Sequence, residues 1–308
     1  MSAESSSSKG GLAALSTELA DAVERAGRSV VTVEARRRVP GSGIVWPAGG
    51  VIVTADHVLE RQEEIVVVFA GGERVSATVA GRDPGSDIAI LRPESTPAAA
   101  AELAPAESIR VGSLALAVGR AGAGLPGASF GIISAVGGSW RTGRGGTLDG
   151  YLRADLTLYP GFSGGPLVDS LGRVLGVNSS HLAGGQSIAL PATVVSGLVQ
   201  TLLTHGRIRR GFLGVTSRPV EIPANLKEKL ALSQPSGLLV MGVEAETPAE
   251  KAGLMIGDVL LGINGQEVGH PEALQAALGA EVVGKQVTAR VLRGGESKDV
   301  SVIPQERS

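Results

Sequence analysis

Short apolar runs rich in β-branched residues, separated by glycine-rich turns, fill much of the first two thirds of the chain. Gly71-Gly72 lies between two such runs, as in a β-hairpin. Many short strands at regular spacing are typical of sandwiches and barrels, so the pattern predicts an all-β region from Ser29 to about Leu190. The expected strands lie at 30–33, 51–54, 65–69, 75–79, 88–91, 114–118, 132–136, 151–158 and 174–177.

Helical spacing of apolar residues occurs near the N-terminus, where Leu15, Leu19, Val23 and Ala26 recur every three or four residues. This predicts a short amphipathic helix after a Ser-rich start that we expect to be disordered. A second helix is expected over 192–205.

A mixed pattern follows a basic bridge, Arg207–Arg210, which we interpret as a solvated linker. The length of 308 residues favours two domains, and this second one is expected to combine strands with short helices. Its strands are expected at 212–216, 237–243, 258–263, 286–292 and 298–303, and its helices at 248–252 and 271–279.

The amino-acid composition excludes some classes of function and gives no support to others. The chain has no cysteine, which excludes disulfides, thiolate metal sites and a cysteine nucleophile. Its formal net charge of −2 gives no reason to expect nucleic acid as a partner. No apolar stretch is long enough for a membrane span. We expect no cofactor and no metal.

Three motifs carry candidate chemistry, each beside an expected strand. His57 lies in Thr54–Leu59, Asp87 leads into an apolar run, and Ser163 lies in the glycine-rich Gly161–Leu167. A serine hydroxyl needs an imidazole to take its proton and a carboxylate to fix the imidazole tautomer. The order His, Asp, Ser matches the chymotrypsin arrangement, and backbone N–H groups of Gly161 and Ser163 are the expected oxyanion donors.

Alternatives exist for each role. Asp83 competes with Asp87 for the third position, although Asp83 precedes Pro84 and suits a turn. Asp56 adjoins His57 in sequence and receives no role. A lipase-type hydrolase would need its serine between a strand and a helix, and Pro166 with the strand-like residues after it argue against that.

These motifs resemble the HtrA/Deg family of trypsin-like proteases, whose patterns are Thr-Asn-x-His-Val, Asp-Leu-Ala-Val-Leu and Gly-Asn-Ser-Gly-Gly-Pro-Leu. Gly41–Val45 and Ser187–Pro191 match further landmarks, and the stretch from Gly237 to Gly265 resembles the PDZ domains of bacterial proteases. The resemblance implies a mainly β protein with a chymotrypsin-like double β-barrel and a small α+β PDZ domain. The expected boundaries are 1–28 for the N-terminal segment, 29–206 for the protease domain and 211–308 for the PDZ domain.

The resemblance further implies ATP-independent cleavage of unfolded or damaged proteins. Its PDZ domain would bind peptide C-termini through Phe212, Leu213, Gly214 and Val215. Homotrimers are usual in the family, but no aromatic residue precedes Trp46 to form the usual contact, so the trimer stays open. The N-terminus lacks an apolar signal region, and from this we lean slightly toward the cytoplasm, with the periplasm or cell envelope as the alternative.

The substrate pocket is expected to favour small or medium aliphatic side chains. Thr157 and Leu158 stand where a basic-specific enzyme would place a carboxylate. Leu158 would line the pocket, or else belong to the barrel core. The segment Asn178, Ser179 and Ser180 is expected to pair with the substrate backbone as an added strand.

Phe162 departs from the family pattern, which has Asn at this position. A bulky side chain between the two oxyanion donors raises the alternative of a flipped, inactive loop in the resting state. It also keeps open a rival function, a binding or chaperone-like protein without turnover.

Overall fold

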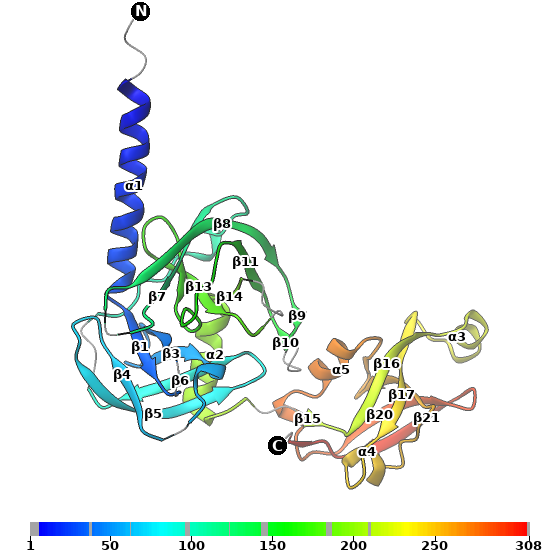
Figure 1. Cartoon of the computed structure of the whole chain (residues 1–308). Coiled ribbons are helices and arrows are strands. Elements are labelled where there is room, and N and C mark those ends of the chain that lie inside the picture. Colours follow the sequence, from blue (N-terminus) through cyan, green and yellow to red (C-terminus); the bar gives the residue numbers. More distant parts are fainter. Residues whose placement is uncertain are drawn as a thin grey trace, which may run out of the picture. The chain divides into compact units, whose positions relative to one another are not determined.

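The computed structural model describes residues 6–36, 39–61, 63–95, 99–122, 124–142, 147–182, 187–208 and 211–306. The chain divides into two compact units, Met1–Arg207 and Ile208–Ser308 (Figure 1).

Two closed, six-stranded antiparallel barrels form the first unit. The strand order is β1-β2-β3-β6-β5-β4 in the first barrel and β11-β14-β13-β12-β7-β8 in the second. The strands of the first are β1 (Val30–Glu34), β2 (Gly41–Val45), β3 (Ile52–Ala55), β4 (Ile65–Val68), β5 (Arg74–Asp83) and β6 (Ile88–Pro93). The strands of the second are β7 (Leu114–Gly119), β8 (Gly127–Gly137), β11 (Tyr151–Asp155), β12 (Pro166–Val168), β13 (Val174–Ser179) and β14 (Ile188–Pro191).

Each barrel encloses its own apolar core. Val33, Ile52 and Leu91 are among the residues buried in the first, and Ile133 and Leu152 are buried in the second. The predominance of branched aliphatic side chains in these positions explains why the runs form strands, because such side chains pack well on a pleated surface. The predicted mainly β, chymotrypsin-like double barrel is confirmed.

Helix α2 (Ala192–His205) connects the two barrels, because it contacts β5 and β6 of the first and β13 and β14 of the second. Its end is set by Gly206, whose φ of 72° is the left-handed conformation that commonly closes a helix. Gly81 permits the close approach of this helix, since a Cβ there would lie 2.7 Å from the Leu202 carbonyl oxygen.

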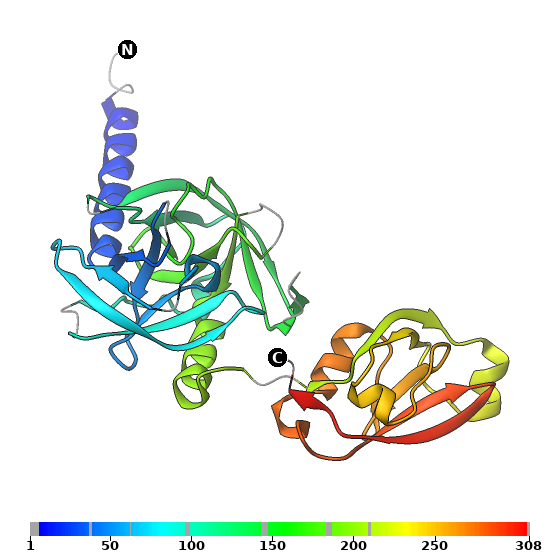
Figure 2. The same cartoon turned by 60° about the horizontal axis from the view of Figure 1, so that its bottom comes forward.

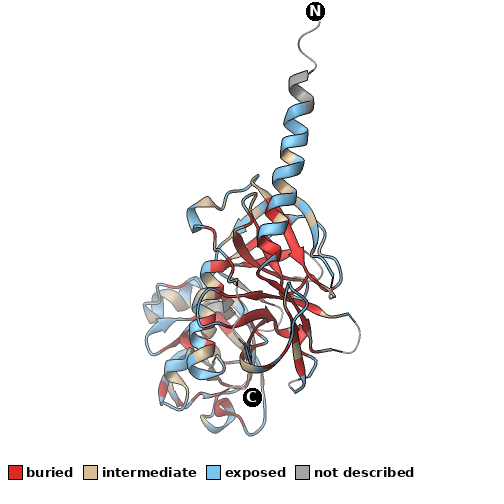
Figure 3. Ribbon diagram, turned by 90° about the vertical axis from the view of Figure 1, so that its left-hand side faces the viewer, coloured by how far each residue is buried: buried red, intermediate tan, exposed pale blue. Residues whose placement is uncertain are grey.

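Helix α1 (Ser6–Gly27) is longer than the sequence predicts, because it begins within the segment expected to be disordered. Ala22 and Ala26 in its C-terminal part are buried, whereas most of its N-terminal part is exposed (Figure 3). No described helix is both long and apolar enough to cross a membrane.

The remaining elements of the first unit are short. They are η1 (Asp56–Val58), η2 (Ala106–Ser108), β9 (Trp140–Arg141) and β10 (Thr147–Leu148). Of these, η1 matters most for the site, because it carries His57 directly after β3.

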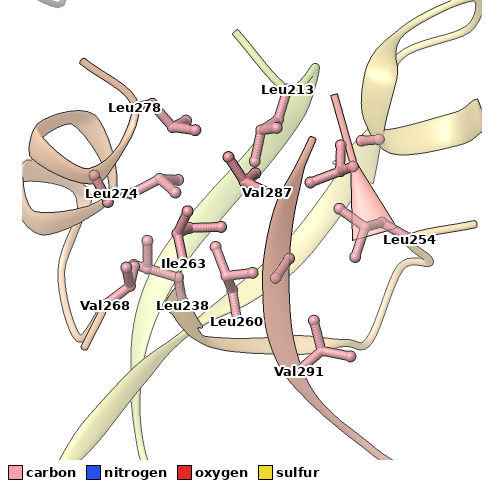
Figure 4. Close-up of a cluster of buried hydrophobic side chains, with 14 residues drawn as sticks. Leu213, Leu238, Leu254, Leu260, Ile263, Val268, Leu274, Leu278, Val287 and Val291 are labelled. Atoms are coloured by element: carbon pink, nitrogen blue, oxygen red, sulfur yellow. The ribbon is translucent and has the colours of Figure 1, made fainter. Parts of the chain in front are cut away.

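A PDZ-like sheet with the order β16-β17-β18-β20-β21 forms the second unit, with β19 paired to β18 and a separate β15–β22 pair (Figure 2). Strand β16 is an edge of this sheet and lies against α5. Leu238, Leu260, Ile263 and Val291 belong to its buried core, which is closed by Leu274 of α5 (Figure 4). Its strands are β15 (Gly211–Phe212), β16 (Val215–Glu221), β17 (Ser236–Val243), β18 (Val259–Ile263), β19 (Gln266–Glu267), β20 (Val287–Arg293), β21 (Glu296–Val302) and β22 (Gln305–Glu306). Its helices are α3 (Ala224–Leu230), α4 (Pro248–Lys251), α5 (Pro271–Ala277) and η3 (Ala280–Val282).

Candidate active site

His57 and Asp87 meet because of strand pairing in the first barrel. Strands β3 and β6 are neighbours with Ala55 opposite Ile88, so the residues just beyond them come together. The Nδ1 atom of His57 lies 2.8 Å from Asp87 Oδ2 and 3.0 Å from Oδ1. The backbone N–H of His57 also donates to Asp87 Oδ1 at 3.0 Å. The carboxylate therefore holds the imidazole with Nε2 on the opposite side.

Asp87 adopts a backbone conformation that is uncommon for residues other than glycine, although aspartate tolerates it better than most. Its φ is 56°, in the left-handed region, and its side chain is 1% exposed. The preceding turn is fixed by Asp83, whose carboxylate accepts the N–H groups of Gly85 at 3.3 Å and Ser86 at 2.9 Å. The structure thus brings Asp87 to His57 and uses Asp83 as a turn cap. Asp56 forms a different contact, an ion pair with Arg82 at 2.6 Å.

The charge state of Asp87 follows from its surroundings. Burial raises the pKa of its carboxyl, but the hydrogen bond and charge of His57, the hydroxyl of Ser179 and the His57 N–H outweigh it, so the pKa is lowered. The hydroxyl of Ser179 donates to Asp87 Oδ2 at 2.5 Å. Asp87 is therefore an anion at neutral pH, as an orienting carboxylate must be.

Ser163 directly follows the tight turn Tyr159–Phe162 and precedes β12. The N–H of Phe162 donates to Tyr159 O at 3.0 Å, and Gly161 has φ of 89°. A turn with proline at its second position and a positive-φ glycine at its third is typical of type II. The turn is fixed to the first barrel by Ser42, whose hydroxyl donates to Gly161 O at 2.6 Å and whose N–H donates to Ser163 O at 3.1 Å.

Two backbone donors beside Ser163 are available for a ligand. Among the described residues, the N–H groups of Gly161 and Ser163 donate no hydrogen bond to another protein group. Gly161 belongs to the Tyr159–Phe162 turn and Ser163 to the next turn, which the Gly165 N–H closes on Phe162 O at 3.0 Å. The two donors are thus on alternate residues, the spacing that the sequence predicts for oxyanion donors.

The hydroxyl of Ser163 is engaged with Ser180. The two Oγ atoms are 3.0 Å apart, and Ser180 N–H donates to Ser163 Oγ at 3.3 Å. Within the described part of the chain no hydrogen bond joins Ser163 to His57. Catalytic hydrogen bonds are often long or unformed without substrate, so the missing bond does not exclude Ser163 as a candidate nucleophile.

His181 is a neighbour that the sequence did not reveal. Its ring stacks on that of His57 with centroids 3.7 Å apart and an interplanar angle of 21°. Its Nδ1 lies 3.4 Å from Ser180 Oγ. No motif marks His181, because the stack depends on a loop of the second barrel meeting η1 of the first. Its ring covers one face of the His57 imidazole.

The predicted substrate-binding residues lie at different depths. Asn178 and Ser179 are buried in β13, each paired across to β14, and Asn178 Nδ2 has no hydrogen-bond partner among the described residues. Ser180 is half-buried at the end of that strand. Leu158 is partly exposed and packs against the core of the second barrel. Its position therefore agrees both with a pocket-lining residue and with a residue of the barrel core.

The predicted carboxylate loop of the second unit joins β15 to β16. Phe212 is the last residue of β15, Leu213 is 2% exposed, and Gly214 has φ of 86°. The N–H groups of Leu213 and Gly214 have no partner within the residues described for this unit. Val215 begins β16, whose outer edge is unpaired in the sheet.

The described residues contain no group of three or more His, Asp or Glu side chains positioned to hold a metal ion.

Comparison with known proteins gives two domain matches. Residues 41–177 match the trypsin-like peptidase domain, and residues 211–303 match the PDZ domain. Among solved structures, the HtrA-type protease AlgW with a tripeptide is 30% identical, with a TM-score of 0.75, over 94% of this chain and 97% of that one. The serine endoprotease from Yersinia pestis is 26% identical, with a TM-score of 0.75, over 94% and 98% of the two chains.

Curated relatives are longer than this chain. A Pseudomonas fluorescens protein named "Probable periplasmic serine endoprotease DegP-like" is 33% identical over 275 residues, which are 86% of this chain and 57% of that protein. A Haemophilus influenzae protein named "Probable periplasmic serine protease do/HhoA-like" is 34% identical over 271 residues, 85% and 57% of the two. The chain thus spans somewhat more than half the length of these relatives. Their periplasmic names contradict the lean toward the cytoplasm, which was wrong because it rested on the absence of a recognisable signal.

Proposed function

Since the chain belongs to the HtrA-type family of serine proteases, with a trypsin-like peptidase domain before a PDZ domain, we propose that it is a serine endopeptidase that cuts unfolded or damaged polypeptides without ATP. His57, Asp87 and Ser163 are its proposed catalytic residues, and Gly161 and Ser163 its proposed oxyanion donors. The observation that carries the proposal is the buried Asp87 carboxylate, 2.8 Å from His57 Nδ1 in the barrel that faces the Ser163 turn.

The first half of the reaction uses the free side of the imidazole. Asp87 accepts a hydrogen bond from Nδ1–H and keeps the proton on that nitrogen, so Nε2 carries a lone pair and can act as a base. The hydroxyl of Ser163 exchanges its bond to Ser180 for one to Nε2. Its oxygen then attacks the peptide carbonyl while the proton passes to His57. The carbonyl oxygen gains the negative charge, which the N–H groups of Gly161 and Ser163 stabilise.

The second half restores the enzyme. His57 gives its proton to the leaving amine as the C–N bond breaks, leaving an acyl ester on Ser163. A water molecule then attacks this ester, with its proton taken by His57, and the acid product leaves. Asp87 stabilises the imidazolium in both halves because its own pKa is lowered and it remains charged.

The PDZ unit is proposed to bind the C-termini of polypeptides. An extended peptide can pair with the open edge of β16 while its carboxylate accepts the N–H groups of Leu213 and Gly214. Solved structures of AlgW that hold a tripeptide and a decapeptide support peptide binding as a function of the family. The two domains are proposed to end and begin near residues 206 and 211.

The periplasmic names of the relatives support a further proposal, that the chain acts in the cell envelope. The homotrimer stays a prediction, as does the absence of nucleic-acid partners. The molar mass of the protein in solution, measured by light scattering, decides the first of these.

Cleavage of casein tests the proposed activity. Ser163→Ala should abolish the release of peptides while leaving the circular dichroism spectrum unchanged, and His57→Ala should do the same. Ser134→Ala, which removes an exposed hydroxyl from β8, is the matched control and should cut normally. Wild-type protein that binds casein and leaves it intact would favour the rival binding function instead.

Specificity follows from the pocket residues. We propose cleavage after small or medium aliphatic residues, since Thr157 and Leu158 offer no carboxylate to pair with Lys or Arg. Mass spectrometry of the casein fragments checks this proposal. A majority of cuts after Lys or Arg would show that the pocket lies elsewhere.

A further inference from the structure

We propose that Phe162 is a positioning residue, a buried wedge that holds the Gly161–Ser163 turn with both N–H donors toward one point before any substrate binds. This inference rests on the proposed serine endopeptidase function. It also reverses the sequence-based alternative, in which a bulky residue here favours a flipped loop.

The ring of Phe162 lies inside the second barrel. Phe162 is 5% exposed and belongs to the apolar core that includes Ile133, Leu152 and Leu167. A side chain adjacent to a nucleophile in a surface loop would ordinarily face solvent. Burying this one fastens the middle of the loop to the barrel.

Two glycines make the slot that receives the ring. Gly119 and Gly127 face each other across β7 and β8. A Cβ at Gly119 would lie 2.5 Å from Phe162 Cδ1, and one at Gly127 would lie 3.2 Å from Cζ. Any larger residue at Gly119 would collide with the ring, so the slot fits an aromatic side chain at 162 and leaves it little freedom.

Contacts on either side of Phe162 fix the turn itself. Its N–H closes the turn on Tyr159 O at 3.0 Å, and the Tyr159 ring meets its ring edge-on with centroids 5.5 Å apart. Ser42 Oγ holds Gly161 O at 2.6 Å and accepts the N–H of Arg120 at 2.8 Å. These contacts fix the Gly161 carbonyl, the Phe162 N–H and the Phe162 ring, and with them the C-terminal side of the turn.

The free N–H groups of Gly161 and Ser163 are the consequence. Because the loop is fixed by its carbonyls and by the Phe162 ring, neither donor is used for internal bonding in the described structure. Preorganised donors stabilise a transition state more than a ground state, since they need no rearrangement when charge develops. Phe162 should therefore affect kcat rather than KM.

The experiment compares Phe162→Leu, Gly127→Ala and the double variant in the full-length protein. Leu keeps the apolar character but lacks the ring atoms that reach Gly127, and Ala at 127 presses on those same atoms. Phe162→Leu should lower kcat on a short peptide ester about 10-fold at similar KM, because small misplacements of catalytic groups are costly. Gly127→Ala should lower kcat by about 2-fold to 3-fold. The double variant should recover part of the Phe162→Leu loss, because the added methyl fills the space of the missing ring atoms.

Binding of a peptide boronate distinguishes a loss of positioning of the oxyanion donors from a general disturbance of the structure. Its boron accepts an electron pair from Ser163 Oγ, the serine proton passes to His57, and a boronate hydroxyl takes the oxyanion position. The Phe162→Leu variant should bind it about 10-fold more weakly, in step with kcat. Binding of an uncleaved peptide to Ser163→Ala should be equal with and without Phe162→Leu. Leu152→Val, in the same core, is the control that should lower the melting temperature while kcat stays at the wild-type value.

The outcomes distinguish this inference from the proposed function. Wild-type protein that neither turns over the ester nor binds the boronate contradicts the endopeptidase and the inference with it. Active wild type with unchanged kcat and boronate affinity in Phe162→Leu overturns the inference alone. Equal losses of boronate and uncleaved-peptide affinity would also overturn it, since they would indicate a disturbed binding cleft.

Discussion

Two loops of this protein carry pairs of backbone N–H groups that donate no hydrogen bond within the described residues, one at Gly161 and Ser163 and one at Leu213 and Gly214. Each contains a positive-φ glycine, Gly161 at 89° and Gly214 at 86°. Each also has a buried apolar neighbour, Phe162 at 5% and Leu213 at 2% exposure. The first would stabilise a charge that exists only during reaction, and the second a carboxylate that is permanently charged.

The loops differ in what holds their carbonyl groups. Gly161 O accepts a side-chain hydroxyl, that of Ser42. Leu213 O and Gly214 O accept backbone N–H groups, from Ala249 at 2.8 Å and Glu244 at 2.9 Å. The protease loop can therefore be weakened by removing one side chain. Within the described residues no side-chain hydroxyl donates to the Leu213 or Gly214 carbonyl, so we expect the PDZ loop to be vulnerable chiefly at its glycine.

The largest expected effect is that of replacing Asp87, the proposed orienting carboxylate. Asp87→Asn should lower kcat by about 10⁴-fold, because the amide no longer fixes the tautomer of His57. Binding of a peptide C-terminus to the PDZ unit should be unchanged. Ester kinetics and isothermal titration calorimetry measure the two, and a kcat within a factor of ten of wild type would show that Asp87 does not orient His57.

Gly214→Ala should break the second loop instead. A Cβ there would lie 2.3 Å from Thr247 Cβ, and φ of 86° is costly for any side chain. We expect at least about 10-fold weaker binding of a peptide with a free C-terminus, by calorimetry, at an unchanged kcat on a short ester. Gly265→Ala is the control, since its φ is 81° but its Cβ would meet nothing within 4 Å. Equal loss in both variants would indicate general strain in the unit.

Ser42→Ala tests the side-chain bond of the first loop. Loss of the hydroxyl frees Gly161 O and leaves Arg120 N–H unpaired, so kcat should fall about 5-fold to 10-fold. Thr32→Val removes another buried hydroxyl of the same barrel, one that donates to Arg120 O at 2.9 Å, and should leave kcat nearly unchanged. Similar losses of kcat in the two variants would show that the Ser42 hydroxyl has no specific role in holding the loop.

The smallest effect concerns Asp258, a buried aspartate of the second unit. Burial raises the pKa of Asp258, but the hydrogen bonds from Arg293 and from the Met255 N–H lower it by more, so the net shift of this pKa is downward. Its contribution to stability is present above the unfolded pKa of about 3.9 and is lost as pH falls through the lower folded value. Asp258→Asn should therefore speed hydrogen exchange in β17 and β18 at pH 7, and much less at pH 2. Asp299→Asn, with a 66% exposed side chain, should show neither effect.

Local motifs explain how much of this could be predicted. His57, Asp87 and Ser163 each follow or precede a strand within a short recognisable string, and the double barrel and PDZ-like unit follow from strand spacing. The His181 stack and the slot at Gly119 and Gly127 could not be predicted, because they depend on strands and loops far apart in sequence. Helix α3 was not predicted; none of its residues is fully buried and no recognised motif contains it.

Phe162 is a second case in which tertiary structure decides what the sequence could not. Its residue type was noticed at once, but its effect depends on whether the ring is exposed or buried. The sequence left open the alternative of a flipped, inactive loop in the resting state, and in that case Phe162→Asn would raise activity. A ring that is 5% exposed in a glycine-lined slot predicts the reverse, a loss of kcat.

Covalent labelling tests the central claim most directly. A fluorophosphonate probe should modify the wild-type protein at one residue, located by peptide mass spectrometry at Ser163. Labelling should be absent in Ser163→Ala and strongly slowed in Asp87→Asn, because the attack needs the oriented base. Wild-type protein that remains unlabelled, or is labelled equally well in Ser163→Ala, would contradict a serine endopeptidase built on His57, Asp87 and Ser163.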